Sequence, residues 1–173
     1  MTENLMLALK VSAEVFVAVA MALSLAHALE YPGKMRLDRP TYVAVQPIYY
    51  PAFSLGRGIS ECLGMILTFV LLILTPNGSE KFNWTAAAFS SLLAMQAIYW
   101  TVTYPVKNFW IEQANWDDGV RRFFGLSATA RAVAVRKRDS LWPELRQRWE
   151  VSQIARAFFG FVSVVTIAVA VAM

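Results

Sequence analysis

Four long apolar segments constrain this chain more than any other feature of its sequence. A transmembrane helix needs about 20 predominantly apolar residues, and stretches of that kind lie near 7–29, 53–74, 84–106 and 151–173. Hydrophobic residues make up 57% of the chain and charged residues only 16%, whereas soluble domains carry about 25% charged residues. We therefore expect an all-α fold in which residues 1–173 form one integral membrane four-helix bundle.

Proline and glycine mark the expected ends of these helices. Tyr-Pro-Gly at 31–33 is expected to end the first helix, because proline cannot continue it. Pro-Asn-Gly at 76–78 predicts a tight turn between the second and third helices. Tyr104-Pro105 is expected to close the third helix, since the residue before proline avoids helical geometry.

The distribution of Lys and Arg predicts the orientation in the membrane. Thirteen of the 16 basic residues fall in or beside the first and third loops, Lys10 and Lys81 lie on the other side, and Arg156 lies within the fourth span. Basic loops face the cytoplasm, so we expect a protein of the cell inner membrane with both termini outside. Because the basic residues flank apolar segments, we expect the lipid bilayer and not nucleic acid as their partner.

A secretory signal is the competing interpretation of the first segment, because Ala-His-Ala at 26–28 resembles a cleavage site after an apolar run. Glu3 stands where a signal would carry basic residues, and Glu14 interrupts the apolar stretch. Both features favour a transmembrane helix.

The third loop is long and contains an amphipathic pattern. Apolar residues recur there at steps of three, four or seven, namely Ala128, Ala132, Val135, Trp142, Leu145 and Trp149. Basic residues lie between them, which predicts an additional cytoplasmic helix, either on an anionic membrane surface or packed against the end of the bundle. The helical pattern then continues from near Pro143 into the fourth span.

Ionisable residues inside the spans are costly and need partners. Lys10 and Glu14 are four residues apart, as are Arg57 and Glu61, so each pair could form an ion pair on one helix. Arg156 is expected to pair within the bundle with a carboxylate, either Glu61 or Glu30.

Polar residues form one stripe on each expected helix, and the predicted topology brings all four stripes to the cytoplasmic half. The stripes are Ser24, His27 and Glu30; Arg57, Glu61, Gly64 and Thr68; Gln96, Tyr99, Trp100, Thr103 and Lys107; and Trp149, Gln153, Arg156 and Gly160. Such groups must face each other or a wet cavity. The two alternatives are a shared cavity ringed by Tyr and Trp, open to the cytoplasm, and a hydrogen-bond network that holds the bundle together.

Several kinds of site are excluded by composition. The chain has one cysteine, Cys62, and one histidine, His27, which leaves no intramolecular disulfide and no His/Cys zinc site. No phosphate-binding glycine loop, dinucleotide fingerprint or serine elbow occurs. We therefore predict no metal site, and the sequence assigns no cofactor.

Four stretches, at 26–37, 42–51, 103–110 and 145–156, resemble the anthrone oxygenase-like family of small four-helix membrane proteins. The resemblance implies oxidation of an anthrone to an anthraquinone without a classical redox cofactor, as in the named fungal members. The positions that match the family motifs are His27, Tyr50, Asn108, Trp149 and Arg156. Relatives often carry His where Tyr104 and Gln153 stand and Asn where Lys107 stands, so His27 is the only imidazole here.

Two classes of function follow. The first is an oxygenase-like enzyme in which His27 or Glu30 takes a proton from an aromatic, quinol-like substrate. The expected substrate-binding residues are Tyr50, Glu61, Gln96, Tyr99, Trp100, Tyr104, Asn108, Trp149, Gln153 and Arg156. The second is a non-catalytic accessory subunit that packs on other membrane protein subunits. A transporter is a weaker third, because Gly or Pro breaks no span at mid-membrane.

Overall fold

The computed structural model describes residues 2–106 and 141–173, and within them every regular element is a helix. Helix α1 spans Glu3–Lys34, α2 spans Arg39–Leu74 and α3 spans Glu80–Ile98. A π-helical segment, η1, continues α3 over Tyr99–Thr103, and α7 spans Trp142–Ala172. The predicted all-α fold is confirmed for these residues.

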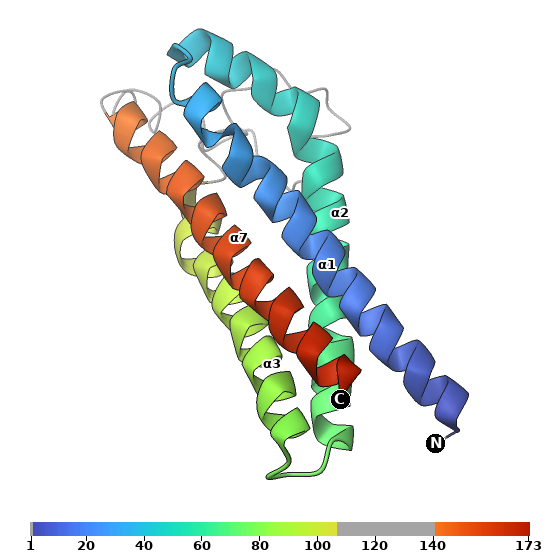
Figure 1. Cartoon of the computed structure of the whole chain (residues 1–173). Coiled ribbons are helices and arrows are strands. Elements are labelled where there is room, and N and C mark those ends of the chain that lie inside the picture. Colours follow the sequence, from blue (N-terminus) through green and yellow to red (C-terminus); the bar gives the residue numbers. More distant parts are fainter. Residues whose placement is uncertain (1, 107–140) are drawn as a thin grey trace.

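The long helices alternate in direction and lie side by side (Figure 1). Both termini and the α2–α3 turn lie at one end of the bundle, which we call the terminal end, and the α1–α2 connection lies at the opposite end. Helix α1 packs extensively on α2 and α7, and α7 also packs on α3, whereas the α2–α3 contact is smaller. Helices α2 and α7 therefore face each other across the diagonal of the bundle.

The distribution of side chains is the reverse of that in a soluble protein. Large apolar side chains cover the outside of α1, α2 and α7, for example Val15, Ile66 and Phe161. Polar and charged side chains are buried inside, among them Glu61 and Arg156. Three helical segments are long and apolar enough to cross a membrane: Glu3–Lys34, Phe53–Leu74 and Trp142–Ala172. Because α3 is not among them, the four-span count stays a prediction.

Helix α1 does not end at 31–33 as predicted, because it runs through Pro32 to Lys34. Pro32 removes one hydrogen bond of the helix, and the helix ends two residues later. Lys34 also holds the last turn in place through an ion pair of 2.6 Å with Glu30, one turn earlier. Helix α7 begins at Trp142, well before residue 151, as the pattern near Pro143 predicted.

The prediction that Tyr104-Pro105 ends the third helix is wrong, since the backbone stays helical through Val106. The π-helical segment η1 allows the helix to continue past Pro105. Pro105 cannot donate to the carbonyl four residues earlier, and its ring would crowd that carbonyl. The wider turn of η1, in which the Tyr104 amide donates to the Tyr99 carbonyl five residues back, relieves this crowding.

The predicted turn at 76–78 is confirmed, with Gly78 in the left-handed region at φ 79°. The Ser79 side chain then caps α3 by accepting a hydrogen bond from the Phe82 amide. Asp38 caps α2 in the same way, accepting from the Thr41 amide at 3.1 Å.

Two glycines allow close contact between helices. A methyl group built on Gly64 of α2 would lie 3.2 Å from the Val17 backbone nitrogen of α1. One built on Gly160 of α7 would lie 3.2 Å from the Met21 Cα, also in α1. These contacts fix the rotation of α2 and α7 about their axes, and so direct their polar stripes inward.

The part of the predicted third-loop helix that precedes residue 141 lies outside the described residues. The last part of this predicted helix, from Trp142 to Trp149, is the first part of α7.

Candidate functional site

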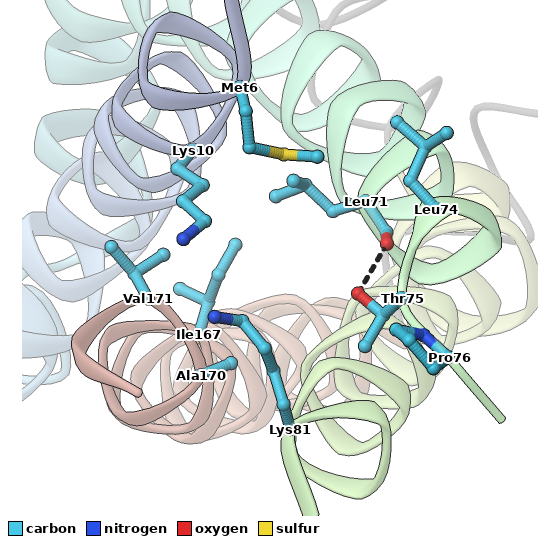
Figure 2. Close-up of a pocket in the computed structure, with 10 residues that line it drawn as sticks. All are labelled: Met6, Lys10, Leu71, Leu74, Thr75, Pro76, Lys81, Ile167, Ala170 and Val171. Carbon is cyan, nitrogen blue, oxygen red and sulfur yellow. Dashed lines mark hydrogen bonds between the residues drawn. The ribbon is translucent and has the colours of Figure 1, made fainter. Parts of the chain in front are cut away.

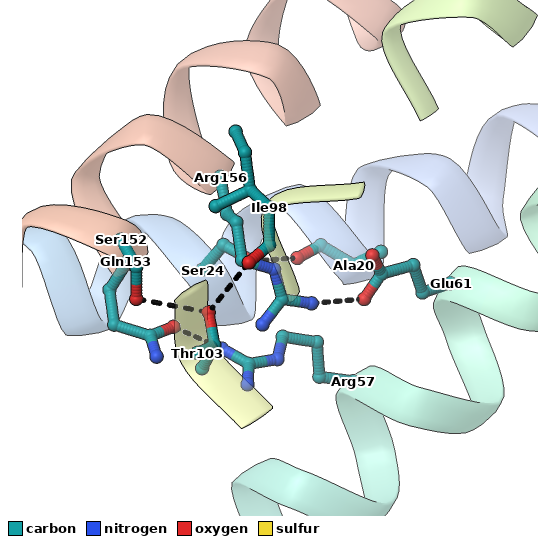
Figure 3. Close-up of polar contacts among 9 residues, drawn as sticks. All are labelled: Ala20, Ser24, Arg57, Glu61, Ile98, Thr103, Ser152, Gln153 and Arg156. Carbon is teal, nitrogen blue, oxygen red and sulfur yellow. Dashed lines mark hydrogen bonds and ion pairs between the residues drawn. The ribbon is translucent and has the colours of Figure 1, made fainter. Parts of the chain in front are cut away.

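The centre of the bundle holds two polar bridges between α2 and α7 (Figure 3). The Arg156 guanidinium donates to the Glu61 carboxylate at 2.5 Å, and the Arg57 guanidinium donates to the Gln153 side-chain oxygen at 2.5 Å. Glu61 and Arg156 are almost completely buried, at 2% and 1% exposure. The predicted pairing of Arg156 with an acidic partner is confirmed, and that partner is Glu61. We call these four residues the polar core.

The polar core spans a diagonal that only long side chains can cross. Because α2 and α7 are not neighbours in the bundle, their backbones stay too far apart for serine or threonine to connect them. Arginine can reach across, and its planar fork suits a buried carboxylate or amide oxygen. The sequence therefore fills the middle of the bundle with charge instead of hydrocarbon.

The η1 segment, which continues α3, also contacts the polar core and the α7 residues beside it. The Thr103 hydroxyl lies 3.0 Å from the Ser152 hydroxyl of α7. The Arg156 guanidinium also lies over the Tyr99 ring, 5.0 Å from its centroid, in a cation–π contact. Tyr99 is thus an aromatic residue of the predicted set that the structure places against the charged centre.

His27 belongs to a neighbouring cluster. Its Nδ1 lies 3.3 Å from the Lys34 ammonium, which also pairs with Glu30 at 2.6 Å. The ring packs edge-on against Phe53 of α2, with centroids 5.0 Å apart. Because an ammonium can only donate, Nδ1 accepts and the neutral ring carries its proton on Nε2.

A third buried contact joins the first turn of α2 to the third turn of α7. The Tyr42 hydroxyl donates to the Glu150 carboxylate at 2.5 Å, and neither residue is exposed. Burial and the negative charge of Glu150 both raise the pKa of Tyr42 well above its usual value of 10. The Tyr42 ring also meets Trp142 edge-on, with centroids 5.3 Å apart.

The predicted site residues separate into groups. Glu61, Tyr99, Gln153 and Arg156 come together, with His27 and Glu30 in the adjacent cluster. Trp149 is buried on α7, one turn before Gln153, and Gln96 is half-buried on α3. Trp100 and Tyr104 are 59% and 41% exposed, so much of each ring faces outward. Asn108 and the side chain of Tyr50 lie outside the described residues.

Lys34, Tyr42 and Glu150 are site residues that the sequence analysis did not single out. Helix bounds that were too short placed Lys34 and Tyr42 in a loop, and Lys34 was counted only as a topology marker. The four-residue step from Glu30 to Lys34 was the available signal, because it predicts an ion pair on a helix that continues to Lys34.

Several buried polar atoms have no hydrogen-bond partner among the described residues, and Glu61 Oε1, Gln153 Nε2 and Thr68 Oγ1 are among them. An unsatisfied buried polar group costs roughly 1–3 kcal/mol. Each is therefore a position where a ligand or water would be stabilising. In residues 2–106 and 141–173, no group of three His, Cys, Asp or Glu side chains could hold a metal ion.

Comparison with known proteins finds no relative of this chain. No protein-family model, curated protein or solved structure matches the chain. The resemblance to the anthrone oxygenase-like family therefore rests on the short sequence motifs alone.

Proposed function

We propose that α1, α2, α3 and α7 all cross the cell inner membrane, with both termini outside. The 19 residues of α3 and the 5 of η1 together extend about 35 Å, at about 1.5 Å per residue. A bilayer core is about 30 Å thick, and α3 packs along α7, which is itself apolar enough to span. Lys34, Arg36 and Arg39 gather at the end opposite the termini, which supports a cytoplasmic position for that end.

We further propose that the polar core binds an aromatic, quinol-like molecule and that the chain acts on it as an oxygenase-like membrane enzyme. The observation that carries this proposal is that two buried atoms of the polar core, Glu61 Oε1 and Gln153 Nε2, have no hydrogen-bond partner among the described residues. A ligand with hydroxyl or carbonyl oxygens would supply the missing donor for the carboxylate and the missing acceptor for the amide.

The energetics of the Glu61–Arg156 pair support a functional role. Replacing a buried ion pair by well-packed apolar residues is often neutral or stabilising, so packing alone does not explain charge at this depth. Ionisable residues within a membrane commonly mark a site of function. The π-helical segment beside the pair is a second feature that is frequent at functional sites.

The contacts of His27 suggest how it would act on such a ligand. With Nδ1 engaged by Lys34, the Nε2 proton is the one available to a ligand oxygen. His27 would then donate a hydrogen bond and orient the ring. Of the two residues expected to accept a proton, Glu30 is the better candidate, because the acceptor nitrogen of His27 is already engaged by Lys34.

The alternative is a non-catalytic accessory subunit in which the polar core only holds the bundle together. The observation in its favour is that most polar groups of the core already bond to one another. Glu61 accepts from Arg156, Gln153 from Arg57, and Thr103 lies within hydrogen-bond distance of Ser152. A ligand would have to share or break these bonds.

Melting curves with a membrane-soluble hydroquinone separate the two functions. Binding to the folded state at 100 times Kd stabilises it by about 2.7 kcal/mol, which raises Tm. We expect this shift for the wild type and its loss in Glu61→Gln. Ser163→Ala is the matched control, because Ser163 donates to the Ala88 carbonyl outside the polar core and its loss should leave the shift intact. If the hydroquinone shifts no Tm, the accessory-subunit proposal replaces the enzyme.

A further inference from the structure

A cavity of about 190 Å³ opens at the terminal end of the bundle, far from the polar core (Figure 2). All four long helices contribute to it, and its walls are largely hydrocarbon, including Met6, Leu71, Ile167 and Val171. The volume is below the roughly 300–1,000 Å³ of pockets for drug-sized ligands. It suits a head group or one end of a longer molecule.

Two lysine side chains, Lys10 of α1 and Lys81 of α3, point into this cavity. Figure 2 shows both amine nitrogens directed into the same opening from different helices. No ion pair joins Lys10 to Glu14 in the part of the chain that the structure describes, so the pair that the four-residue spacing allowed does not form. Neither lysine has an acidic partner among the described residues.

Two ammonium groups that face one cavity repel each other, and hydrocarbon walls strengthen the repulsion because they exclude water. An anion between the two nitrogens would turn this repulsion into two charge-assisted hydrogen bonds.

We propose that this cavity binds the phosphate of an anionic phospholipid, held between Lys10 and Lys81. A phosphate presents several acceptor oxygens, so it can bond to both ammonium groups at once. The cavity lies beside the α2–α3 turn, at the end of the spans, which is the depth at which lipid phosphates are found. The first methylene groups of the lipid would contact Met6 and Leu74 at the cavity wall. This inference depends on the membrane position of the helices but not on a quinol site in the polar core.

Native mass spectrometry of the full chain tests the proposal by counting retained lipids after mixed-lipid exchange in detergent. We expect phosphatidylglycerol to be retained about tenfold more strongly than phosphatidylcholine, which corresponds to 1.4 kcal/mol. Lys10→Gln and Lys81→Gln should each remove most of this preference, whereas Lys81→Arg should keep it. Arg36→Gln is the matched control, since it removes one exposed positive charge at the opposite end.

Three outcomes would overturn the inference. One is equal retention of the two phospholipids by the wild type, a result that needs no variant to fold. Another is a loss in Arg36→Gln as large as that in Lys81→Gln, which would indicate general attraction to the net charge. The third is oleate displacing phosphatidylglycerol at equal concentration, which would assign the cavity to a carboxylate in place of a phosphate.

Discussion

Two glycines of α2 should respond in opposite ways to the same substitution. A methyl group on Gly64 would lie 3.1 Å from Val17 Cγ2 and 3.2 Å from the Val17 backbone nitrogen, so α1 would have to move. Such overpacking costs about 1–3 kcal/mol, and replacing glycine by alanine in a helix returns about 1 kcal/mol. Gly64→Ala should therefore lower the free energy of unfolding by up to about 2 kcal/mol.

Gly58 is the matched control, because a methyl group there meets nothing within 4 Å. Gly58→Ala should gain the helix-propensity term alone and raise stability by about 1 kcal/mol. Unfolding of both variants in one detergent, followed by circular dichroism, measures the difference. Val17→Ala in the Gly64→Ala background should restore only part of the loss, because the backbone contact remains. Equal stabilisation by both alanines would refute the close α1–α2 contact.

Three further outcomes are expected. Gly160→Ala should also destabilise the bundle, by up to about 2 kcal/mol, since its methyl group would press on the Met21 backbone. Melting curves check this, and no loss would contradict the α1–α7 contact. Folding raises the pKa of Tyr42. The Tyr42 hydroxyl therefore stabilises the folded state fully below pH 10, and this stabilisation is lost as the pH rises further. Tyr42→Phe should flatten this alkaline loss, and a wild-type stability that stays constant above pH 10 would contradict it. A reporter that works only in the cytoplasm should be inactive when fused at Met173, and activity there would reverse the orientation.

The helical faces were predictable from the sequence, and the partners across the bundle were only partly so. The spacing of three or four residues correctly predicted that His27, Glu61 and Arg156 lie on buried helix faces. Residues at this spacing share one face of a helix whatever the rest of the fold. The Glu61–Arg156 pair followed from the cost of an unpaired charge in lipid, which leaves few acceptors to choose from. The Arg57–Gln153 bond had no such constraint, since several polar side chains could have satisfied either residue.

The helix ends were the least predictable part of the fold. Pro32 and Pro105 were expected to end helices, but each lies where a neighbouring feature compensates for the missing hydrogen bond. That feature is the Glu30–Lys34 ion pair in the first case and the π-helical turn in the second. Both depend on the surrounding structure, so proline rules applied to the sequence alone place the ends too early. As a result, Lys34 was left off the buried face of the first helix. Tyr42 was missed for a different reason, because α2 begins at Arg39 and not near residue 53.

The polar core and the lysine cavity occupy the same diagonal gap between α2 and α7, the polar core at its middle and the cavity at the terminal end. In the middle of the bundle, long side chains such as Glu61 and Arg156 cross the gap and close it. Near the termini, the facing residues are shorter and apolar, for example Leu71 and Ala170, so the gap remains as a cavity. Since one helix arrangement produces both, a change that brings α2 and α7 closer should disturb both sites together. Substitutions at Lys81 should disturb only the cavity, and this separation distinguishes a lipid effect from a general loss of packing.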